Sequence, residues 1–312
     1  MAQKPVGGKN SPPTKKGSGC IKGCLVILFV PILLIAGSIL FATKELRRSD
    51  EDILKTYQPK PEIAEIAEKN TLTDKGKATF YRADPELVEA ESFIKYCRTF
   101  ARGVESLACN APKPGGGPFG GRKMFLLKID DQKFADHKFS AAVHEMLHIA
   151  YSRLGSDEKK RLNALLDQEL TKRQNDSHLM TVIDTLKKNK NNDEKDIQEE
   201  LHSKFGVEFI DISLELEDYY KQYFTDRSKV VELFKNGGFN SRVRRMDEIS
   251  YQVKSLAPQI TAYEQAGDVI NFNRLVGQYN TLAAESQKIY SEIQKFYQYF
   301  NPDYQPPENK AQ

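Results

Sequence analysis

The stretch Ala141-Ala142-Val143-His144-Glu145-Met146-Leu147-His148-Ile149-Ala150 decides how the rest of the chain is interpreted. Helical residues four apart lie on one face, one turn apart, so the imidazoles of His144 and His148 can reach a single metal ion. Glu145 directly follows the first histidine, where a carboxylate can sit beside a metal-bound water. The remaining residues of the stretch are apolar and uncharged, as a helix buried behind a cleft requires.

A metal-binding helix explains this stretch better than a purely structural one. Burying two imidazoles on an otherwise apolar helix costs free energy unless a partner compensates. The stretch resembles the HExxH signature of zinc metallopeptidases, the zincin superfamily. The resemblance implies one Zn²⁺ ion bound by His144 and His148, and Glu145 as the general base that takes a proton from water.

The resemblance also implies a third zinc ligand, because a catalytic zinc typically has three protein ligands and a water. The metzincin pattern would place a histidine at position 154, which is leucine. The gluzincin pattern takes a glutamate from a downstream helix, and Glu199-Glu200-Leu201-His202-Ser203 resembles its N-E-x-x-S/A form. Glu200 is therefore the predicted ligand. The alternatives are Glu199, His202, His178 and Glu169.

Two positions depart from the gluzincin pattern. Glu199 replaces the usual asparagine, and Lys204 stands where thermolysin-like enzymes carry an aspartate that orients a ligand histidine. Gluzincins also use a tyrosine or histidine to hydrogen-bond the developing oxyanion. By resemblance we predict Tyr220 in that role, with His202 as the alternative. Core packing on an amphipathic helix is the competing explanation for the tyrosine.

Residues 24–43 are consecutive and uncharged. About 20 helical residues span the hydrocarbon core of a bilayer, so we predict one uncleaved transmembrane helix. Residues 1–23 carry five lysines and no acid, whereas Lys44, Arg47 and Arg48 are the basic residues that closely follow the segment. This bias predicts a cytoplasmic N-terminus, so the protein is expected to be a single-pass protein of the cell membrane with residues 44–312 outside.

The pattern of the whole chain predicts a mainly α-helical protein with a small β-sheet. Residues 1–23 are expected to form a disordered tail and residues 44–70 a polar stalk. Residues 71–225 are expected to form the α+β zincin-like domain, and residues 226–300 a C-terminal helical segment. A second disordered tail is expected over 301–312.

Lys123–Asp130 is predicted to be a strand, because it is apolar and bounded by loop signals. In zincins the strand before the active-site helix forms a sheet edge along which an extended peptide lies. By resemblance, Phe125 and Leu127 are therefore candidates to line the cleft, with a plain core strand as the equal alternative. The active-site helix is predicted from Ser140, as N-cap, to Gly155.

A helix from about 194 to 205 is predicted to carry Glu200 and to end at Gly206. Residues 226–300 are predicted to be strongly helical, with breaks near Gly237-Gly238 and Gly267. Apolar residues recur there at threes and fours, which is typical of a coiled coil or helical hairpin. An intramolecular antiparallel hairpin is favoured. Packing on the catalytic domain and dimerisation are alternatives, and the oligomeric state stays open.

Cys97 and Cys109 fall in the predicted exterior, where a disulfide would persist. We therefore favour a disulfide between them, with two unpaired buried thiols as the alternative. Cys20 and Cys24 lie at the edge of the apolar segment and are interpreted as apolar filler, with acylation sites as the alternative.

Hydrolysis of peptide bonds outside the membrane is the predicted function, with a peptide or protein as substrate. The net charge is only +3, from 46 basic and 43 acidic residues, and no basic stripe stands out, so nucleic acid is not an expected partner. One alternative is a catalytically silent zincin-fold interaction protein at the cell surface. Another is a zinc amidase that acts on cell-wall peptides.

Overall fold

The computed structural model describes residues 48–97, 107–114, 122–188 and 193–300. From Ser49 onward these residues form one compact unit. Within the described ranges, no helix combines the length and the apolar character needed to cross a membrane. The predicted transmembrane segment 24–43 and the predicted tails 1–23 and 301–312 lie outside the described residues.

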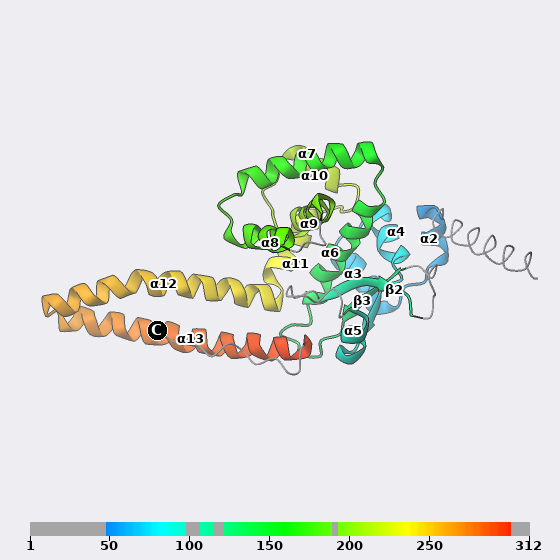
Figure 1. Cartoon of the computed structure of the whole chain (residues 1–312). Coiled ribbons are helices and arrows are strands. Elements are labelled where there is room, and N and C mark those ends of the chain that lie inside the picture. The colour runs from blue at the N-terminus through cyan, green and yellow to red at the C-terminus, as the bar shows by residue number, and fades with distance from the viewer. Residues whose placement is uncertain (1–47, 98–106, 115–121, 189–192, 301–312) are drawn as a thin grey trace, which may run out of the picture. The chain divides into compact units, whose positions relative to one another are not determined.

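The described chain is mostly helical and contains one small sheet, as predicted (Figure 1). The helices are α2 (Asp50–Thr56), α3 (Pro61–Lys69), α4 (Asp74–Arg82), α5 (Ala90–Cys97), α6 (His137–Ser152), α7 (Ser156–Lys172), α8 (Ser177–Lys188), α9 (Glu194–Val207), α10 (Leu214–Tyr220), α11 (Arg227–Asn236), α12 (Gly238–Ala266) and α13 (Val269–Phe300). The strands are β1 (Glu86–Val88), β2 (Ala108–Pro112) and β3 (Arg122–Leu127).

Strand β3 is the central strand of the sheet, whose order is β1-β3-β2. It pairs in parallel with β1 and antiparallel with β2. Because side chains alternate across a strand, Met124 and Leu126 join the core around α6, whereas Phe125 and Leu127 face a second cluster with α5. All four side chains are buried. Strand β3 is therefore covered on both faces.

Of the two equal alternatives for Lys123–Asp130, the plain core strand is confirmed and the sheet edge is wrong. The strand ends at Leu127, and the edge next to α6 is formed by β2. Phe125 and Leu127 are packing residues of the second cluster, so they do not line a cleft. On its other side, β3 pairs with the very short parallel strand β1, which was not predicted.

Helix α6 lies at the centre of the main core, against α3, α4, α9, α11 and the sheet. Its apolar face is fully buried, including Val143, Met146 and Leu147. The helix begins at His137, three residues before the predicted N-cap, and Ser140 lies inside its first turn. It ends at Ser152, and Gly155 is the N-cap of α7.

Two short helices occupy the described part of the predicted stalk. Helices α2 and α3 bury Ile53, Ile63 and Ile66 in the main core, which also contains the apolar face of α6. Helix α11, beyond the boundary predicted at residue 225, packs against α6 and α9. Both flanks thus contribute to the body that holds the HExxH helix.

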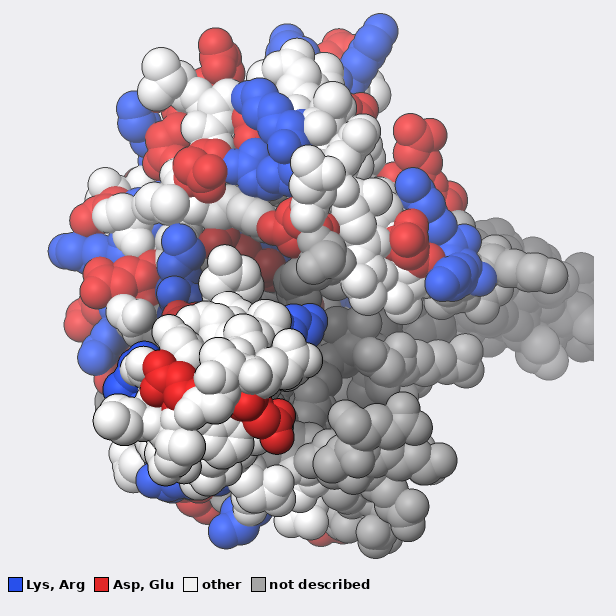
Figure 2. Space-filling model, turned by 90° about the vertical axis from the view of Figure 1, so that its left-hand side faces the viewer, with Lys and Arg blue, Asp and Glu red and all other residues white. Residues whose placement is uncertain are grey.

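Helices α12 and α13 form the predicted antiparallel hairpin and lie side by side along their length (Figure 1). The predicted breaks are confirmed, since α11 ends before Gly237-Gly238 and the hairpin turns at Gly267. Gly267 has φ of 68°, a left-handed conformation that glycine adopts without a Cβ clash. Figure 2 looks at the tip of the hairpin, where most side chains are uncharged and a few acidic ones lie among them.

The base of the hairpin is held by aromatic packing and ion pairs. Phe296 of α13 stacks on Phe239 of α12 at 4.6 Å between ring centroids and contacts Phe134 at 4.8 Å. Glu292 accepts hydrogen bonds from Arg242 and Lys133. The hairpin is thereby fixed beside the start of α6.

The favoured disulfide between Cys97 and Cys109 is confirmed, with 5.8 Å between the Cα atoms. It joins the end of α5 to β2, and both sulfurs belong to the buried cluster behind the sheet. Closing a loop of this size stabilises the folded state by about 3 kcal/mol in the chain-entropy model. The crosslink restrains the strand that lies nearest to Glu145.

Candidate metal centre

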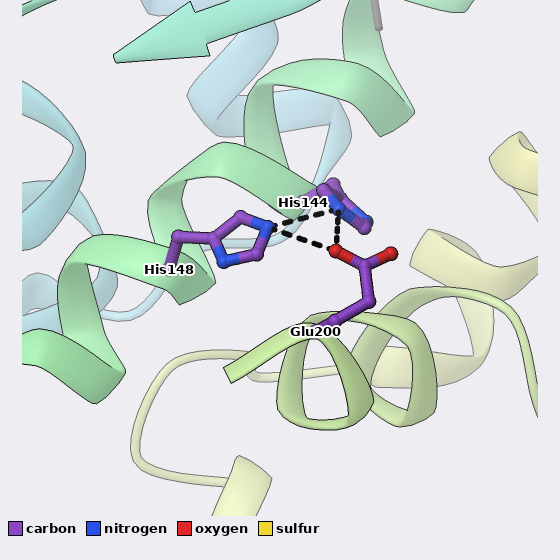
Figure 3. Close-up of side chains that lie close together, drawn as sticks. All are labelled: His144, His148 and Glu200. Carbon is purple, nitrogen blue, oxygen red and sulfur yellow. Dashed lines mark hydrogen bonds and ion pairs between the residues drawn. The ribbon is translucent and has the colours of Figure 1, made fainter. Parts of the chain in front are cut away.

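His144 and His148 project from one face of α6 toward Glu200 of α9 (Figure 3). Their Nε2 atoms are 3.1 Å apart. The Glu200 Oε2 atom lies 3.7 Å from Nε2 of His144 and 3.5 Å from Nε2 of His148. The three side chains are only partly exposed and form the one such group of potential metal ligands among the described residues. The structure therefore brings together all three predicted ligands.

The spacing of these three donor atoms fits a single tetrahedral metal ion. Donors that each lie about 2.0–2.1 Å from a tetrahedral ion are separated from one another by roughly 3.3 Å. The observed separations of 3.1, 3.5 and 3.7 Å bracket that value. Two imidazoles and a carboxylate are also a donor set that Zn²⁺ commonly uses, although other divalent ions accept it as well.

A close approach of α9 to α6 makes this convergence possible. At Gly206 a Cβ atom would come within 2.3 Å of Leu147 Cδ1 and about 3.0 Å of the Tyr220 ring. A larger residue at position 206 would therefore require the Leu147 side chain and the Tyr220 ring to shift. Gly206 was predicted to end the helix, but α9 continues through Val207.

Glu199 contacts His148 on the side of the ring away from Glu200. Its Oε1 atom lies 3.3 Å from Nδ1 of His148, while Nε2 of the same ring faces Glu200. A carboxylate on Nδ1 fixes the ring orientation and makes Nε2 a better donor. Glu199 therefore orients His148, one of the three candidate ligands.

Lys204 is a buried cation next to the ligand carboxylate. Its Nζ atom lies 2.8 Å from Glu208 Oε1 and 3.8 Å from Glu200 Oε1. Burial lowers the pKa of Lys204, but the two carboxylates raise it more, so the net shift is upward and the amine stays charged. Lys204 thus holds the Glu200 oxygen that faces away from the histidines.

The charges around the site follow from this arrangement. Burial raises the pKa of Glu200, but His144, His148 and Lys204 together lower it well below its ordinary value. Burial lowers the pKa of His148, but the hydrogen bond to Glu199 and the surrounding carboxylates raise it to about 9. Glu200 is therefore ionised, and a metal ion must displace a proton from His148 to bind.

Glu145 points into the same cleft and is held by a residue of β2. The Asn110 side-chain amide donates to Glu145 Oε2 at 2.7 Å and to the Glu145 carbonyl at 3.2 Å. The sequence analysis missed Asn110. Its position in an edge strand depends on pairing with β3, which no local sequence signal at Asn110 indicates.

The cleft has a volume of about 470 Å³ and opens beside the histidines. One wall is formed by Leu107 and by Ala108, Cys109 and Asn110 of β2. The opposite wall includes Val182 and Leu186 of α8. Phe234 of α11 and Phe239 of the hairpin base complete an apolar side. An apolar space thus adjoins a polar, ionised centre.

The prediction of Tyr220 as a catalytic residue is wrong. Tyr220 is fully buried, and its hydroxyl donates to the His202 carbonyl at 2.6 Å. His202 is also fully buried, with Nδ1 3.1 Å from the Leu147 carbonyl. Both residues pack α9 and α10 against α6 and do not reach the cleft.

Of the alternative third ligands, His202 and Glu169 do not line the cleft. Glu169 is buried between Lys172, Arg173 and the backbone amide of Ser213. The His178 side chain lies outside the described residues.

Comparison with protein-family models, with curated proteins and with solved structures finds no match to this chain.

Proposed function

We propose that this protein is a membrane-anchored zinc metallopeptidase of the gluzincin type. The observation that carries the proposal is the triangle of His144, His148 and Glu200 donors, with the Glu145 carboxylate in the same cleft. When bound, a zinc ion acts as a Lewis acid and makes a water molecule more acidic. The membrane anchor is the uncharged segment 24–43.

Glu145 is the proposed general base. Its carboxylate accepts a proton from the attacking water and passes it to the leaving amine, so the peptide bond is hydrolysed without a covalent intermediate. The hydrogen bond from Asn110 holds Oε2 of Glu145 at 2.7 Å and orients the carboxylate for this proton transfer. Lys204 holds the Glu200 carboxylate in place, and Glu199 holds the His148 ring.

The proposed substrate is an extended peptide that lies along β2. This strand is antiparallel to β3 and forms the edge of the sheet next to the cleft. An extended segment that pairs with an edge strand gains main-chain hydrogen bonds that tolerate many sequences. The apolar side of the cleft, with Val182 and Phe234, favours a substrate with an apolar side chain near the cleaved bond.

The test is peptide hydrolysis by the full chain in mild detergent with zinc present. Wild type is expected to cleave members of a quenched fluorescent peptide library. Glu145→Gln should lower kcat by at least about 100-fold, because it removes the general base. Glu264→Gln on the exposed hairpin is the matched control and should retain wild-type rates.

Equal inertness of wild type and Glu145→Gln on both peptides and cell-wall fragments, with zinc bound, would contradict the peptidase proposal. That outcome would favour the interaction protein. Cleavage of wall fragments alone would favour the amidase.

A further inference from the structure

Ser203 lies one helical turn after Glu200 on α9 and is fully buried. Its Oγ atom is 3.3 Å from Nε2 of His144 and 3.4 Å from Nε2 of His148. These are the two imidazole atoms that face Glu200. A neutral hydroxyl therefore stands beside the triangle of donors.

The distances from Ser203 match those between donors that share one ion. Neighbouring ligands of a five-coordinate zinc are separated by roughly 2.9–3.6 Å, because the angles between them are about 90–120°. The Ser203 oxygen meets that spacing to both histidines, as closely as Glu200 does. A residue that only filled space beside the ligands would not need to lie at the donor–donor distance from both histidines.

The hydrogen bonding of Ser203 leaves its lone pairs available. The hydroxyl donates its single hydrogen to the Glu200 carbonyl at 2.8 Å. A hydroxyl has one donor and two acceptor lone pairs, so the side of Oγ that faces the imidazoles is a lone-pair side. In the metal-free protein it can accept a hydrogen bond from an imidazole N–H, and a bound cation can take that place.

Ser203 approaches the centre from the side opposite the cleft. His144, His148, Glu200 and Glu145 all line the cleft, whereas Ser203 does not and has no exposed surface. Among the described residues, the cleft is the opening that the three ligands and Glu145 line. A donor at Ser203 would therefore leave the cleft-facing position open.

We propose that the Ser203 hydroxyl is a fourth protein donor to the divalent cation, from the buried side of the His144, His148 and Glu200 triangle. The inference rests on the proposed metal centre. It adds a donor that the gluzincin pattern does not use as a ligand, and it implies a centre that binds three strong donors, one weak donor and a solvent molecule. The weak neutral donor adds no charge to the site.

The test uses cobalt(II) as a spectroscopic probe in the full chain. A thiolate bonded to cobalt(II) gives an intense charge-transfer absorption in the near ultraviolet, which oxygen donors do not give. Ser203→Cys should show this band at one equivalent of cobalt(II). Ser255→Cys is the matched control, because Ser255 makes the same hydroxyl bond to the carbonyl three residues earlier, but on the distal hairpin. It should show no band.

Ser203→Ala provides a second measurement if the cysteine variant does not fold. Loss of the donor should weaken cobalt(II) binding about tenfold and change the visible d–d bands, as expected when the coordination number falls. A wild-type chain that binds one cobalt(II), with no charge-transfer band in Ser203→Cys and unchanged spectra and affinity in Ser203→Ala, overturns the Ser203 proposal and leaves the metal centre intact. A wild-type chain that binds no cobalt(II) or zinc overturns both.

Discussion

The side-chain amide of Asn110 donates to Oε2 of Glu145 across 2.7 Å and joins the edge strand to the HExxH helix. The neighbouring residue of Asn110 is Cys109, which the disulfide ties to the end of α5. The position of the proposed general base is thus set from outside its own helix. The sheet edge, the disulfide and Glu145 form one connected unit.

Replacing Asn110 with alanine should lower kcat/KM about tenfold, since the carboxylate of Glu145 loses the group that orients it. Zinc content should stay at the wild-type level, because Asn110 contacts none of the three ligands in the described structure. Steady-state kinetics and metal analysis on the same samples test this. Asn280→Ala on the exposed hairpin is the control, and equal rates in the two variants would refute the role of Asn110.

Glu199→Gln should weaken zinc binding by about 10–100-fold, the usual effect of removing a carboxylate that supports a ligand histidine. The reason is the 3.3 Å contact between Glu199 Oε1 and Nδ1 of His148. Competition against a chelator of known affinity measures the change. Glu194→Gln, on an exposed position of the same helix, should bind zinc like wild type. Identical zinc affinities of Glu199→Gln and wild type would show that Glu199 does not orient the His148 ring for metal binding.

Arg227 holds the end of the helix that carries Glu200. Its guanidinium donates to the carbonyls of Phe205, Phe209 and Ile210 and pairs with Glu217. Because the group is buried, Arg227→Met should lower the free energy of unfolding by about 3–5 kcal/mol. Urea denaturation followed by circular dichroism measures this. A loss below about 1 kcal/mol would contradict the assignment.

His137 makes the fold sensitive to acid. Burial lowers its pKa from an ordinary 6.5 to about 4, and its Nδ1 has no hydrogen-bond partner in the described part of the chain. Between pH 6.5 and 4 the unfolded chain therefore binds a proton that the folded chain does not. The contribution of the neutral histidine to the free energy of unfolding is fully present above pH 6.5 and is lost as the pH falls through this window.

That contribution amounts to about 3 kcal/mol across the window. His137→Phe keeps a ring against Phe239 and Phe296 but cannot titrate, so its free energy of unfolding should fall less than that of wild type between pH 7 and 4. Urea titrations at each pH give both curves. Parallel curves would rule out His137 as the titrating group.

Local sequence signals predicted the features that depend on local geometry. The spacing of His144 and His148 places both rings on one helical face whatever surrounds them. Gly267 adopts the left-handed conformation that glycine favours, so the turn of the hairpin was predictable. The approach of Glu200 was predicted from resemblance to the gluzincin pattern and not from spacing.

Features that depend on distant contacts were not predictable from one sequence. Asn110 meets Glu145 only because β2 pairs with β3 in a particular register. Strand β1 has three residues, too few for a periodic signal, so the sheet edge was assigned to the wrong strand. Tyr220 is a packing residue because α10 directs it into the core, which its spacing in the sequence does not reveal.

The metal content of the purified full chain tests the central claim most directly. After zinc loading and removal of free ions, elemental analysis should find about one zinc per wild-type chain. Glu200→Ala should bind almost none under the same conditions, while Glu264→Gln should match wild type. A wild-type chain free of metal, or a Glu200→Ala chain that retains one tightly bound zinc, would contradict the account.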